Sequence, residues 1–330
     1  MKIHNPFFKK KKSLFLSDIL KSLDLTYRKT NKIKIFDITD LINAGPNDIS
    51  FFNSIKYLEL LKNSKAKYVI THKKYEKLIN KICNPILVDN VLKSVSIVSN
   101  LFYPTALNDA IDFTVSKPKN KLLKRIKFGK NVLLGKNVKI GSNSIIGHNT
   151  IIESNVIIGS NCTIGNNVLI KNSLIGNYVR ILDGAILGKK GFGFLPDKKK
   201  NIRYPHIGMV IIKDNVEIGC NNTIDRGSLS NTVIGKNTFL DNQVHIAHNV
   251  RIGKNCMIAG QVGFAGSSTI GNNVSIGGQA GISGHLKIGN NVKIGGGSGV
   301  IKDIEDNQIV MGYPAISFKD FIKKNRNNNE

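Results

Sequence analysis

From residue 234 to residue 300, an apolar side chain occupies every sixth position without a miss. Neither the two-residue period of an ordinary strand nor the 3.6-residue period of a helix keeps a six-residue register over so many steps. The pattern therefore predicts a parallel β-helix built from hexapeptide repeats. The marker residues are Ile234, Leu240, Ile246, Ile252, Ile258, Phe264, Ile270, Ile276, Ile282, Ile288, Ile294 and Val300.

A second run of the same pattern precedes this one. Apolar residues recur at every sixth position from Phe128 to Ile170, and the register then slips by one residue at Ile175. Gly and Asn are frequent between the markers, and both tolerate the positive φ values of tight corners. Three hexads would form one triangular coil of about eighteen residues, with coils about 4.8 Å apart. We expect roughly nine or ten coils in a prism about 45 Å tall.

Two interruptions of the repeat are informative. Residues 188–206 have no hexad phase and are expected to leave the prism as a loop insertion, which is where solenoids tend to place binding. The lysine tip of this loop, Lys198–Lys200, is interpreted as a solvated surface. A smaller four-residue excess around Arg226 to Ser230 marks another corner.

The rest of the chain has different patterns. Residues 1–105 combine helix-like apolar spacing near their start with short β-rich runs, which predicts a small N-terminal α/β domain. Residues 106–119 are expected to serve as a linker to a β-helix over 120–312. Residues 313–330 are expected to form a short C-terminal helix and tail.

Composition limits the function classes. The sequence has no long apolar run and no signal-like segment, so a cytoplasmic location is expected. Its four cysteines lie far apart and are interpreted as reduced structural thiols. The formal net charge of +26 suits a phosphorylated substrate or an acidic protein partner. The lysines are spread along the chain without a nucleic-acid-binding motif, so no nucleic-acid partner is expected.

Candidate catalytic residues break the monotony of the repeat. His248 takes the third place of its hexad, and adding eighteen residues gives Gly266 and then Gly284, next to His285. The arithmetic of the repeat therefore places two histidines and a glycine corner in one column along an edge of the prism. A neutral imidazole is the natural general base near pH 7. A glycine corner can present an unobstructed backbone N–H to a developing oxyanion.

Several strings in the sequence resemble a known enzyme family. They are Thr223-Ile-Asp-Arg-Gly-Ser228, the segment 240–253 with its Ile246-Ala-His-Asn249, Phe264-Ala-Gly-Ser267, Ser283-Gly-His-Leu-Lys-Ile-Gly289, Met311-Gly-Tyr-Pro-Ala315 and Gly191-Phe-Gly-Phe194. Together with the order of domains, they are similar to the UDP-3-O-(3-hydroxyacyl)glucosamine N-acyltransferases of lipid A biosynthesis. The likeness extends from about residue 14 to residue 315 and implies a left-handed β-helix.

The resemblance implies an enzyme, an acyltransferase that needs no cofactor of its own. It would move a 3-hydroxyacyl chain from the phosphopantetheine of acyl carrier protein to the 2-amino group of a UDP-linked 3-O-acylglucosamine. In the matched positions, His248 is the catalytic general base, Gly266 the oxyanion donor and His285 a second active-site histidine. Asp241 and Asn242 match polar, substrate-binding residues beside the site. His245 stands where relatives have Gln or His, and it is also a candidate for substrate binding.

The N-terminal domain carries the candidate nucleotide site. The segment from Ser50 to Tyr57 resembles the uridine-binding segment of the family, in which two aromatic residues six positions apart hold the uracil. Here these are Phe51 and Tyr57, and Ser54 stands where the family has Asn. Strand alternation predicts that one of Phe51 and Phe52 belongs to the core.

The expected partners are acyl carrier protein, a UDP-sugar lipid precursor and further copies of the chain. A three-sided prism packs readily about a threefold axis, so we expect a homotrimer with active sites in the clefts between neighbours. The basic tail around Lys319–Arg326 is a candidate docking site for the carrier protein. Contact with a membrane is expected to be peripheral at most.

Three other interpretations remain open. The lipid A O-acyltransferases share the β-helix, but they carry a larger helical domain after it and lack a uridine-binding domain before it. A γ-type carbonic anhydrase also shares the fold and needs three histidines on zinc. A non-catalytic scaffold is the third class, and any acyl-transfer activity would exclude it.

Overall fold

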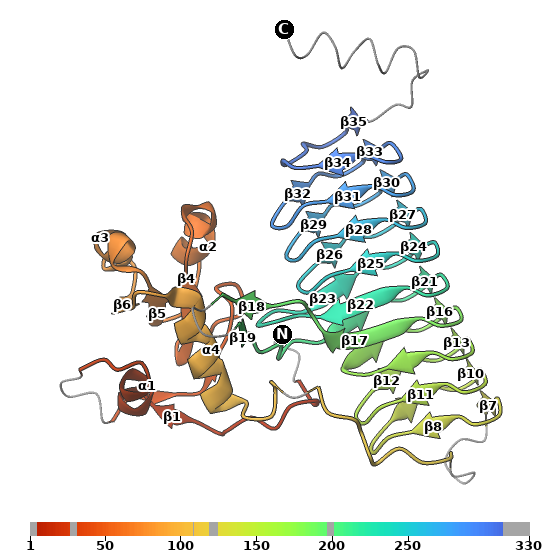
Figure 1. Cartoon of the computed structure of the whole chain (residues 1–330), viewed down its shortest axis with the longest axis horizontal. Helices are drawn as coiled ribbons and strands as arrows, with labels where there is room; N and C mark the ends of the chain where they lie inside the picture. The colour runs from red at the N-terminus through yellow and green to blue at the C-terminus, as the bar shows by residue number, and fades with distance from the viewer. Residues whose placement is uncertain (1–4, 27–31, 108, 119–124, 197–200, 313–330) are drawn as a thin grey trace, which may run out of the picture.

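The computed structural model describes residues 5–26, 32–107, 109–118, 125–196 and 201–312. Within these ranges, short strands from residue 127 to residue 310 form three parallel sheets of ten, nine and eight strands. Consecutive strands pass from one sheet to the next in turn, so the chain winds around a three-sided prism (Figure 1). The predicted parallel β-helix is confirmed.

The first sheet lies at both ends of the coil series. It contains β7 (Lys127–Phe128), β10 (Ile145–Ile146), β13 (Thr163–Ile164), β16 (Arg180–Ile181), β21 (Glu217–Ile218), β24 (Phe239–Leu240), β27 (Met257–Ile258), β30 (Ser275–Ile276), β33 (Lys293–Ile294) and β35 (Ile309–Val310).

The second sheet carries most of the candidate site residues. It contains β8 (Leu133–Leu134), β11 (Ile151–Ile152), β14 (Leu169–Ile170), β17 (Ile186–Lys190), β22 (Thr223–Arg226), β25 (His245–Ile246), β28 (Gly263–Phe264), β31 (Gly281–Ile282) and β34 (Gly299–Val300).

The third sheet completes the prism. It contains β9 (Lys139–Ile140), β12 (Ile157–Ile158), β15 (Ser173–Ile175), β20 (Val210–Ile212), β23 (Thr232–Ile234), β26 (Arg251–Ile252), β29 (Thr269–Ile270) and β32 (Lys287–Ile288). We call the three edges of the prism the 1–2, 2–3 and 3–1 edges, after the sheets that meet there.

The hexad markers point into the prism and form its core. Ile246 pairs with Phe264, eighteen residues later, and each of these side chains is fully buried. The one-residue slip appears where Ile158 pairs with Ile175. The four-residue excess appears where Ile218 pairs with Leu240, and both irregularities were predicted from the sequence. Each buried marker removes apolar surface from water, at about 25 cal/mol per Å².

Asparagines hold most corners. They adopt left-handed φ angles near +60°, a conformation that Asn tolerates better than other side chains that carry a Cβ. Their amides also stack from coil to coil, as when Asn255 Nδ2 donates to Asn273 Oδ1 at 3.1 Å. The corner residue therefore fixes both the local turn and the spacing between coils.

The N-terminal α/β domain has a parallel four-stranded sheet. Its strands are β3 (Asp37–Ile38), β4 (Asp48–Phe52), β5 (Tyr68–Thr71) and β6 (Asn84–Leu87), in that order. The other elements are the antiparallel pair β1 (Leu14–Phe15) and β2 (Lys34–Ile35), the helices α1 (Leu16–Ser22), α2 (Leu58–Lys62), α3 (Glu76–Ile79) and α4 (Val91–Phe102), and the 3₁₀ turns η1 (Ile55–Tyr57) and η2 (Lys73–Tyr75). Phe52 is buried in this core, whereas Phe51 is half-buried, as strand alternation predicts.

The insertion begins later than the sequence pattern indicated. Residues 188–206 were expected to leave the prism together, but Lys189 and Lys190 still pair with β22, at Asp225 and Arg226. The strand β17 continues because a register shift after Leu187 accommodates the loss of hexad phase. Beyond it, β18 (Phe194–Leu195) and β19 (Ile202–Arg203) form an antiparallel pair.

The insertion lies between the two folded units (Figure 1). Ile207, at the end of the insertion, is 4% exposed and belongs to the same apolar cluster as Phe102 of α4. Tyr204 and Leu229 pack against this cluster. The insertion thus joins the N-terminal domain to the β-helix through apolar contacts.

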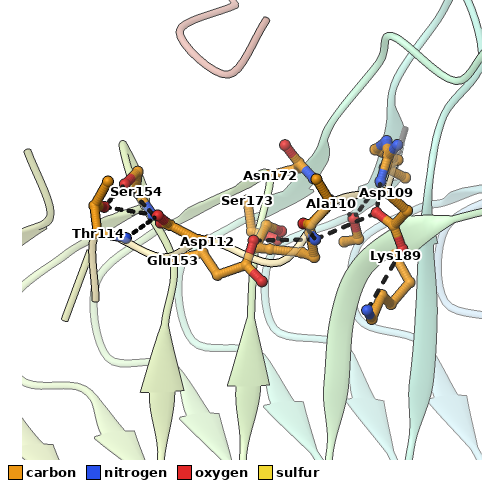
Figure 2. A network of polar contacts seen from close by, with 12 residues as sticks. Asp109, Ala110, Asp112, Thr114, Glu153, Ser154, Asn172, Ser173 and Lys189 are labelled. Atoms are coloured by element: carbon orange, nitrogen blue, oxygen red, sulfur yellow. Dashed lines mark hydrogen bonds and ion pairs between the residues drawn. The ribbon is translucent and has the colours of Figure 1, made fainter. Parts of the chain in front are cut away.

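The segment expected to be a linker is bound to the β-helix by polar contacts (Figure 2). Asp112 accepts hydrogen bonds from the backbone N–H and the hydroxyl of Ser154, at 2.8 and 2.6 Å. Asp109 lies 3.1 Å from Arg226 and 3.3 Å from Lys171. Burial opposes the charge of Asp109, but Lys171, Arg226 and Lys189 outweigh it and lower the pKa of Asp109 to about 2. These contacts fix the path of the chain between the two units.

Several expectations lie outside the described residues. The C-terminal helix and tail over 313–330, with the basic segment Lys319–Arg326, and the lysine tip Lys198–Lys200 are among them.

Candidate active site

A groove of about 570 Å³ runs along the outer face of the second sheet. Gly263 and Gly281 form part of its floor, and a Cβ added at either position would meet no atom within 4 Å. The groove therefore owes its depth to missing side chains. Its lining residues are Phe192, His245, Ala247, His248, Gly263, Phe264, Ala265, Gly266, Gly281, Ile282 and Ser283.

The hydrogen bonds around His248 define its tautomer. His248 Nδ1 lies 2.9 Å from Asn249 Oδ1. That oxygen also accepts from the backbone N–H and hydroxyl of Ser228, which fixes the orientation of the amide. Because an amide oxygen only accepts, Nδ1 carries the proton and Nε2 keeps its lone pair. His248 can therefore accept a proton at Nε2.

Gly266 lies against the imidazole of His248. A Cβ at this position would be 2.6 Å from His248 Cε1 and 2.8 Å from Nε2, so glycine is required for the observed ring position. The backbone continues the column predicted from the repeat, since Ser267 N–H donates to His248 O and His285 N–H donates to Gly266 O, both at 3.0 Å. The N–H of Gly266 itself makes no hydrogen bond to the described part of the chain.

His285 connects the β-helix to the N-terminal domain. Its Nδ1 lies 2.7 Å from the Tyr57 hydroxyl, and its carbonyl oxygen accepts from Lys56 Nζ at 2.5 Å. Burial, His248 and Lys56 lower the pKa of His285, while burial raises the pKa of Tyr57. The phenol is therefore the donor and the neutral imidazole the acceptor. Phe51, the other aromatic residue predicted to hold the uracil, packs against the apolar cluster that contains Phe102 and Ile207.

His245 lines the same groove as His248. It projects from β25, and its Nδ1 lies 2.7 Å from the Thr223 hydroxyl. Burial lowers the pKa of His245, so the ring is neutral near pH 7. The sequence-predicted residues His245, His248 and Gly266 thus come together within one chain.

Asp241 and Asn242 lie elsewhere. They follow β24 at the 1–2 edge, whereas His248 follows β25 at the 2–3 edge. Asn242 accepts a hydrogen bond from Cys220 N–H at 2.7 Å and lines a second groove of about 470 Å³. The other residues of this second groove are Gln243, Gly260, Gln261, Gly278 and Gln279. Within one chain, the structure does not bring Asp241 or Asn242 into the first groove.

Sequence reasoning missed three features of these grooves. Phe192, 85% exposed, lines the first groove, and buried His206 lies against His248. Gln243, Gln261 and Gln279 form a hydrogen-bonded ladder in the second groove. Their eighteen-residue spacing was visible in the sequence and could have found them, because glutamine replaces asparagine at three stacked corners.

The described ranges contain no group of three or more His, Cys, Asp and Glu side chains placed to hold a metal ion. Within the same ranges, every helix is too short or too polar to cross a membrane.

Comparisons with known proteins agree with the architecture. Residues 32–101 match the family model of UDP-3-O-(3-hydroxymyristoyl) glucosamine N-acyltransferase, LpxD. Residues 125–159, 137–172 and 231–266 match the bacterial transferase hexapeptide model. A UDP-3-O-acylglucosamine N-acyltransferase from Rhizobium johnstonii is 39% identical over 257 residues, which cover 75% of this chain and 73% of that protein. The chain belongs to the UDP-3-O-acylglucosamine N-acyltransferase family.

Sequence identity to some members of this acyltransferase family is higher over a shorter stretch. The Rhizobium rhizogenes member is 56% identical over 79 residues, which cover 24% of this chain and 22% of that protein. Among solved structures, the UDP-N-acetylglucosamine O-acyltransferase LpxA of Moraxella catarrhalis is 27% identical, with a TM-score of 0.38, over 61% of this chain and 76% of that one.

Proposed function

We propose that the protein transfers a 3-hydroxyacyl chain from acyl carrier protein to the 2-amino group of UDP-3-O-(3-hydroxyacyl)glucosamine, a step of lipid A biosynthesis. Family membership supports the reaction class. The observation that carries the assignment of residues is the pair formed by His248 and Gly266. Nε2 of His248 lies against Gly266, whose backbone N–H has no hydrogen-bond partner among the described residues, at a groove with an apolar lining.

The chemistry follows from this pair. The sugar amine attacks the thioester carbon, a C–N bond forms, and Nε2 of His248 removes a proton from the nitrogen. The carbonyl oxygen gains negative charge, which the N–H of Gly266 stabilises. When the intermediate collapses, the C–S bond breaks and the imidazolium returns its proton to the pantetheine sulfur. The products are an amide and a free thiol.

The groove floor suits an acyl chain. Gly263 and Gly281 leave an open channel along the second sheet, and Phe192, Ala265 and Ile282 supply apolar surface. Burying a methylene group contributes about 0.8 kcal/mol, so such a channel can select chains by length.

Tyr57 and Phe51 are proposed to hold the uracil. The Tyr57–His285 hydrogen bond supports this role, because it places the N-terminal domain within direct contact of the column that bears His248. His285 would then orient the sugar, and His245 would bind a polar group of the substrate at the groove floor.

A homotrimer is proposed from the division of the predicted site between two edges. Asp241 and Asn242 lie at the 1–2 edge and His248 at the 2–3 edge. Packing three prisms around a threefold axis places unlike edges of neighbours together, because a cyclic interface joins two different surfaces. A neighbouring copy would thereby supply Asp241 and Asn242 to the first groove. Binding of acyl carrier protein and a cytoplasmic location complete the proposal.

The test is an acyl-transfer assay with purified protein, 3-hydroxyacyl carrier protein and UDP-3-O-(3-hydroxyacyl)glucosamine, followed by mass spectrometry. We expect one added acyl group on the nitrogen, resistant to mild alkaline hydrolysis. A parallel reaction with UDP-N-acetylglucosamine tests the O-acyltransferase alternative. An alkali-labile ester on that sugar, with no amide formed on the amine, would overturn the proposal.

A further inference from the structure

A buried histidine from the insertion lies against the ring of His248. His206 is 1% exposed, and its imidazole meets that of His248 edge to face, with ring centroids 5.1 Å apart. The reaction proposed above assigns no role to this side chain.

His206 is held in one neutral tautomer. Its Nδ1 lies 3.1 Å from the carbonyl oxygen of Tyr204, which can only accept, so Nδ1 carries the hydrogen. Its Nε2 then has a lone pair and no hydrogen-bond partner in the described part of the chain. Burial, with the charges of His248 and Arg226, lowers the pKa of His206 to about 3. The ring is therefore neutral at any pH at which His248 would act.

The backbone of His206 is fixed to the β-helix. Its carbonyl oxygen accepts a hydrogen bond from Arg226 Nε at 2.9 Å. Arg226 is itself 1% exposed and bonds Asp109 and the carbonyl oxygen of Gly188, both at 3.1 Å. Three hydrogen bonds from Nε and Nη1 hold this buried guanidinium, and its planar shape loses little conformational freedom for each bond formed. His206 is therefore a fixed support rather than a mobile loop residue.

Gly191 closes over both rings. A Cβ at Gly191 would lie 2.8 Å from His248 Cδ2 and 3.0 Å from His206 Nε2. On its other side, His248 meets Gly266, where a Cβ would be 2.6 Å from Cε1. The imidazole of His248 is thus confined between two glycines, with His206 at its edge.

We propose that His206 is a positioning residue for His248: it holds the imidazole against Gly266, with Nε2 directed toward the groove. The inference rests on the proposed function, in which His248 accepts the proton of the amine. Because that step makes His248 cationic, the support must be neutral. A second cation whose ring centre lies 5.1 Å away would oppose proton transfer.

The test compares three variants with the wild type as full-length protein. His206→Ala removes the ring, His206→Gln keeps a neutral donor and acceptor, and His148→Gln is a matched control at an exposed corner far along the sequence. We expect His206→Ala to lower kcat about 10- to 100-fold, since small misplacements of a catalytic group have effects of this size. KM for both substrates should stay within about twofold, His206→Gln should recover most of kcat, and His148→Gln should match the wild type.

A second measurement does not depend on activity. In protein with ¹³C-labelled histidine, the ring resonance of His248 is identified by its disappearance in His248→Ala. Loss of the His206 ring should shift this resonance, because an adjacent aromatic ring changes the local field. If His206→Ala unfolds the insertion, His206→Leu fills the volume and provides the same comparison.

The outcomes separate the two proposals. Normal kcat or an unshifted His248 resonance in His206→Ala, with His248→Ala inactive, would overturn the positioning role and leave the proposed function in place. A rise in KM with kcat unchanged would overturn it as well. Full activity of His248→Ala would overturn the proposed function instead.

Discussion

The 3–1 edge and the other two edges of the prism differ in the residues that hold their corners. From residue 205 onward, the described corners of the 3–1 edge with left-handed φ angles are all asparagine, at Asn215, Asn237, Asn255, Asn273, Asn291 and Asn307. In the same coils, the 1–2 edge begins with Asn221 and the 2–3 edge with Asn249. The later corners are Gln243, Gln261 and Gln279 at the 1–2 edge and Ser267 and His285 at the 2–3 edge, with φ angles between 59° and 66°.

The corner residues differ in how well they tolerate the left-handed backbone conformation. Asn adopts the left-handed conformation at low cost, whereas Gln, Ser and His pay more for the same geometry. From residue 205 onward the 3–1 edge keeps Asn at these corners, although Tyr178 holds an earlier corner of the same edge with a φ of 57°. The Gln, Ser and His corners lie in the coils that line the two grooves. In these coils the corners that depart from Asn coincide with the grooves, whereas Tyr178 shows that a strained corner alone does not mark a groove.

The largest expected effect is at the 2–3 edge. His248→Ala should lower turnover at least about 100-fold, because it removes the proposed general base, whereas His285→Ala should lower it less. The oligomer mass and the melting temperature should remain those of the wild type, since neither ring belongs to the buried apolar core. Steady-state kinetics and light scattering measure both properties. Turnover near the wild-type value in His248→Ala would contradict the proposed role of His248 as the general base.

Alanine substitutions at three glycines should separate effects on activity from effects on stability. Gly266→Ala places a methyl group against the imidazole of His248, a side chain that can move, so kcat should fall at least about tenfold while the fold persists. Gly271→Ala meets the backbone of Gly289 at 2.6 Å, so it should lower stability by about 1 to 3 kcal/mol. Gly299→Ala meets nothing within 4 Å and serves as the control. Denaturation curves and rates for all three variants check the assignment.

The proposed uracil site is tested by two variants that separate the role of the Tyr57 ring from that of its hydroxyl. Tyr57→Ala should raise KM for the UDP-sugar about 5- to 100-fold, because stacking on a base contributes about 1 to 3 kcal/mol. Tyr57→Phe keeps the ring and loses only the bond to His285, so its KM should stay close to that of the wild type. Equal KM values for the Ala and wild-type proteins would place the uracil elsewhere.

Acid should destabilise the protein partly through His206. The folded-state pKa of about 3 lies below the ordinary value of 6.5, so this histidine contributes stability above pH 6.5 that is lost as the pH falls. The groups that set this pKa besides burial are His248, Arg226, Arg203 and the Tyr204 carbonyl. Between pH 7 and pH 5, the loss should be about 2 kcal/mol per chain. Urea unfolding of the wild type and His206→Gln measures it, and equal pH slopes would contradict the buried neutral ring.

The smallest expected effect concerns the corners themselves. Gln261→Asn should relieve left-handed strain and raise stability by up to about 1 kcal/mol, and Asn255→Gln on the 3–1 edge should lower it by a similar amount. If the glutamine ladder serves the reaction, Gln261→Asn should also alter kcat or KM, whereas Asn255→Gln should not. If kcat and KM of both variants equal those of the wild type, the glutamine ladder has no role in the reaction.

The sequence alone determined the β-helix, because the information for it is local and periodic. Each marker such as Ile246 must be apolar to enter the core, and each corner must accept a positive φ, so the requirement repeats every six residues. The same periodicity predicted the column of His248, Gly266 and His285, since stacked coils convert a spacing of eighteen residues into contact. The one-residue slip at Ile175 could also be predicted, because it shifts the six-residue register of the apolar residues.

Only the tertiary structure decided what packs against the prism. The contacts of Tyr57 with His285, of His206 with His248 and of Asp109 with Arg226 join residues with no periodic relation. They depend on how a domain, an insertion and a linker dock through surface shape and buried charge, which leave no repeat in the sequence. The separation of Asp241 and Asn242 from His248 has a different cause, which lies in the geometry of the repeat. Neighbouring hexads lie on different faces of the prism, so nearness in sequence is not nearness in space.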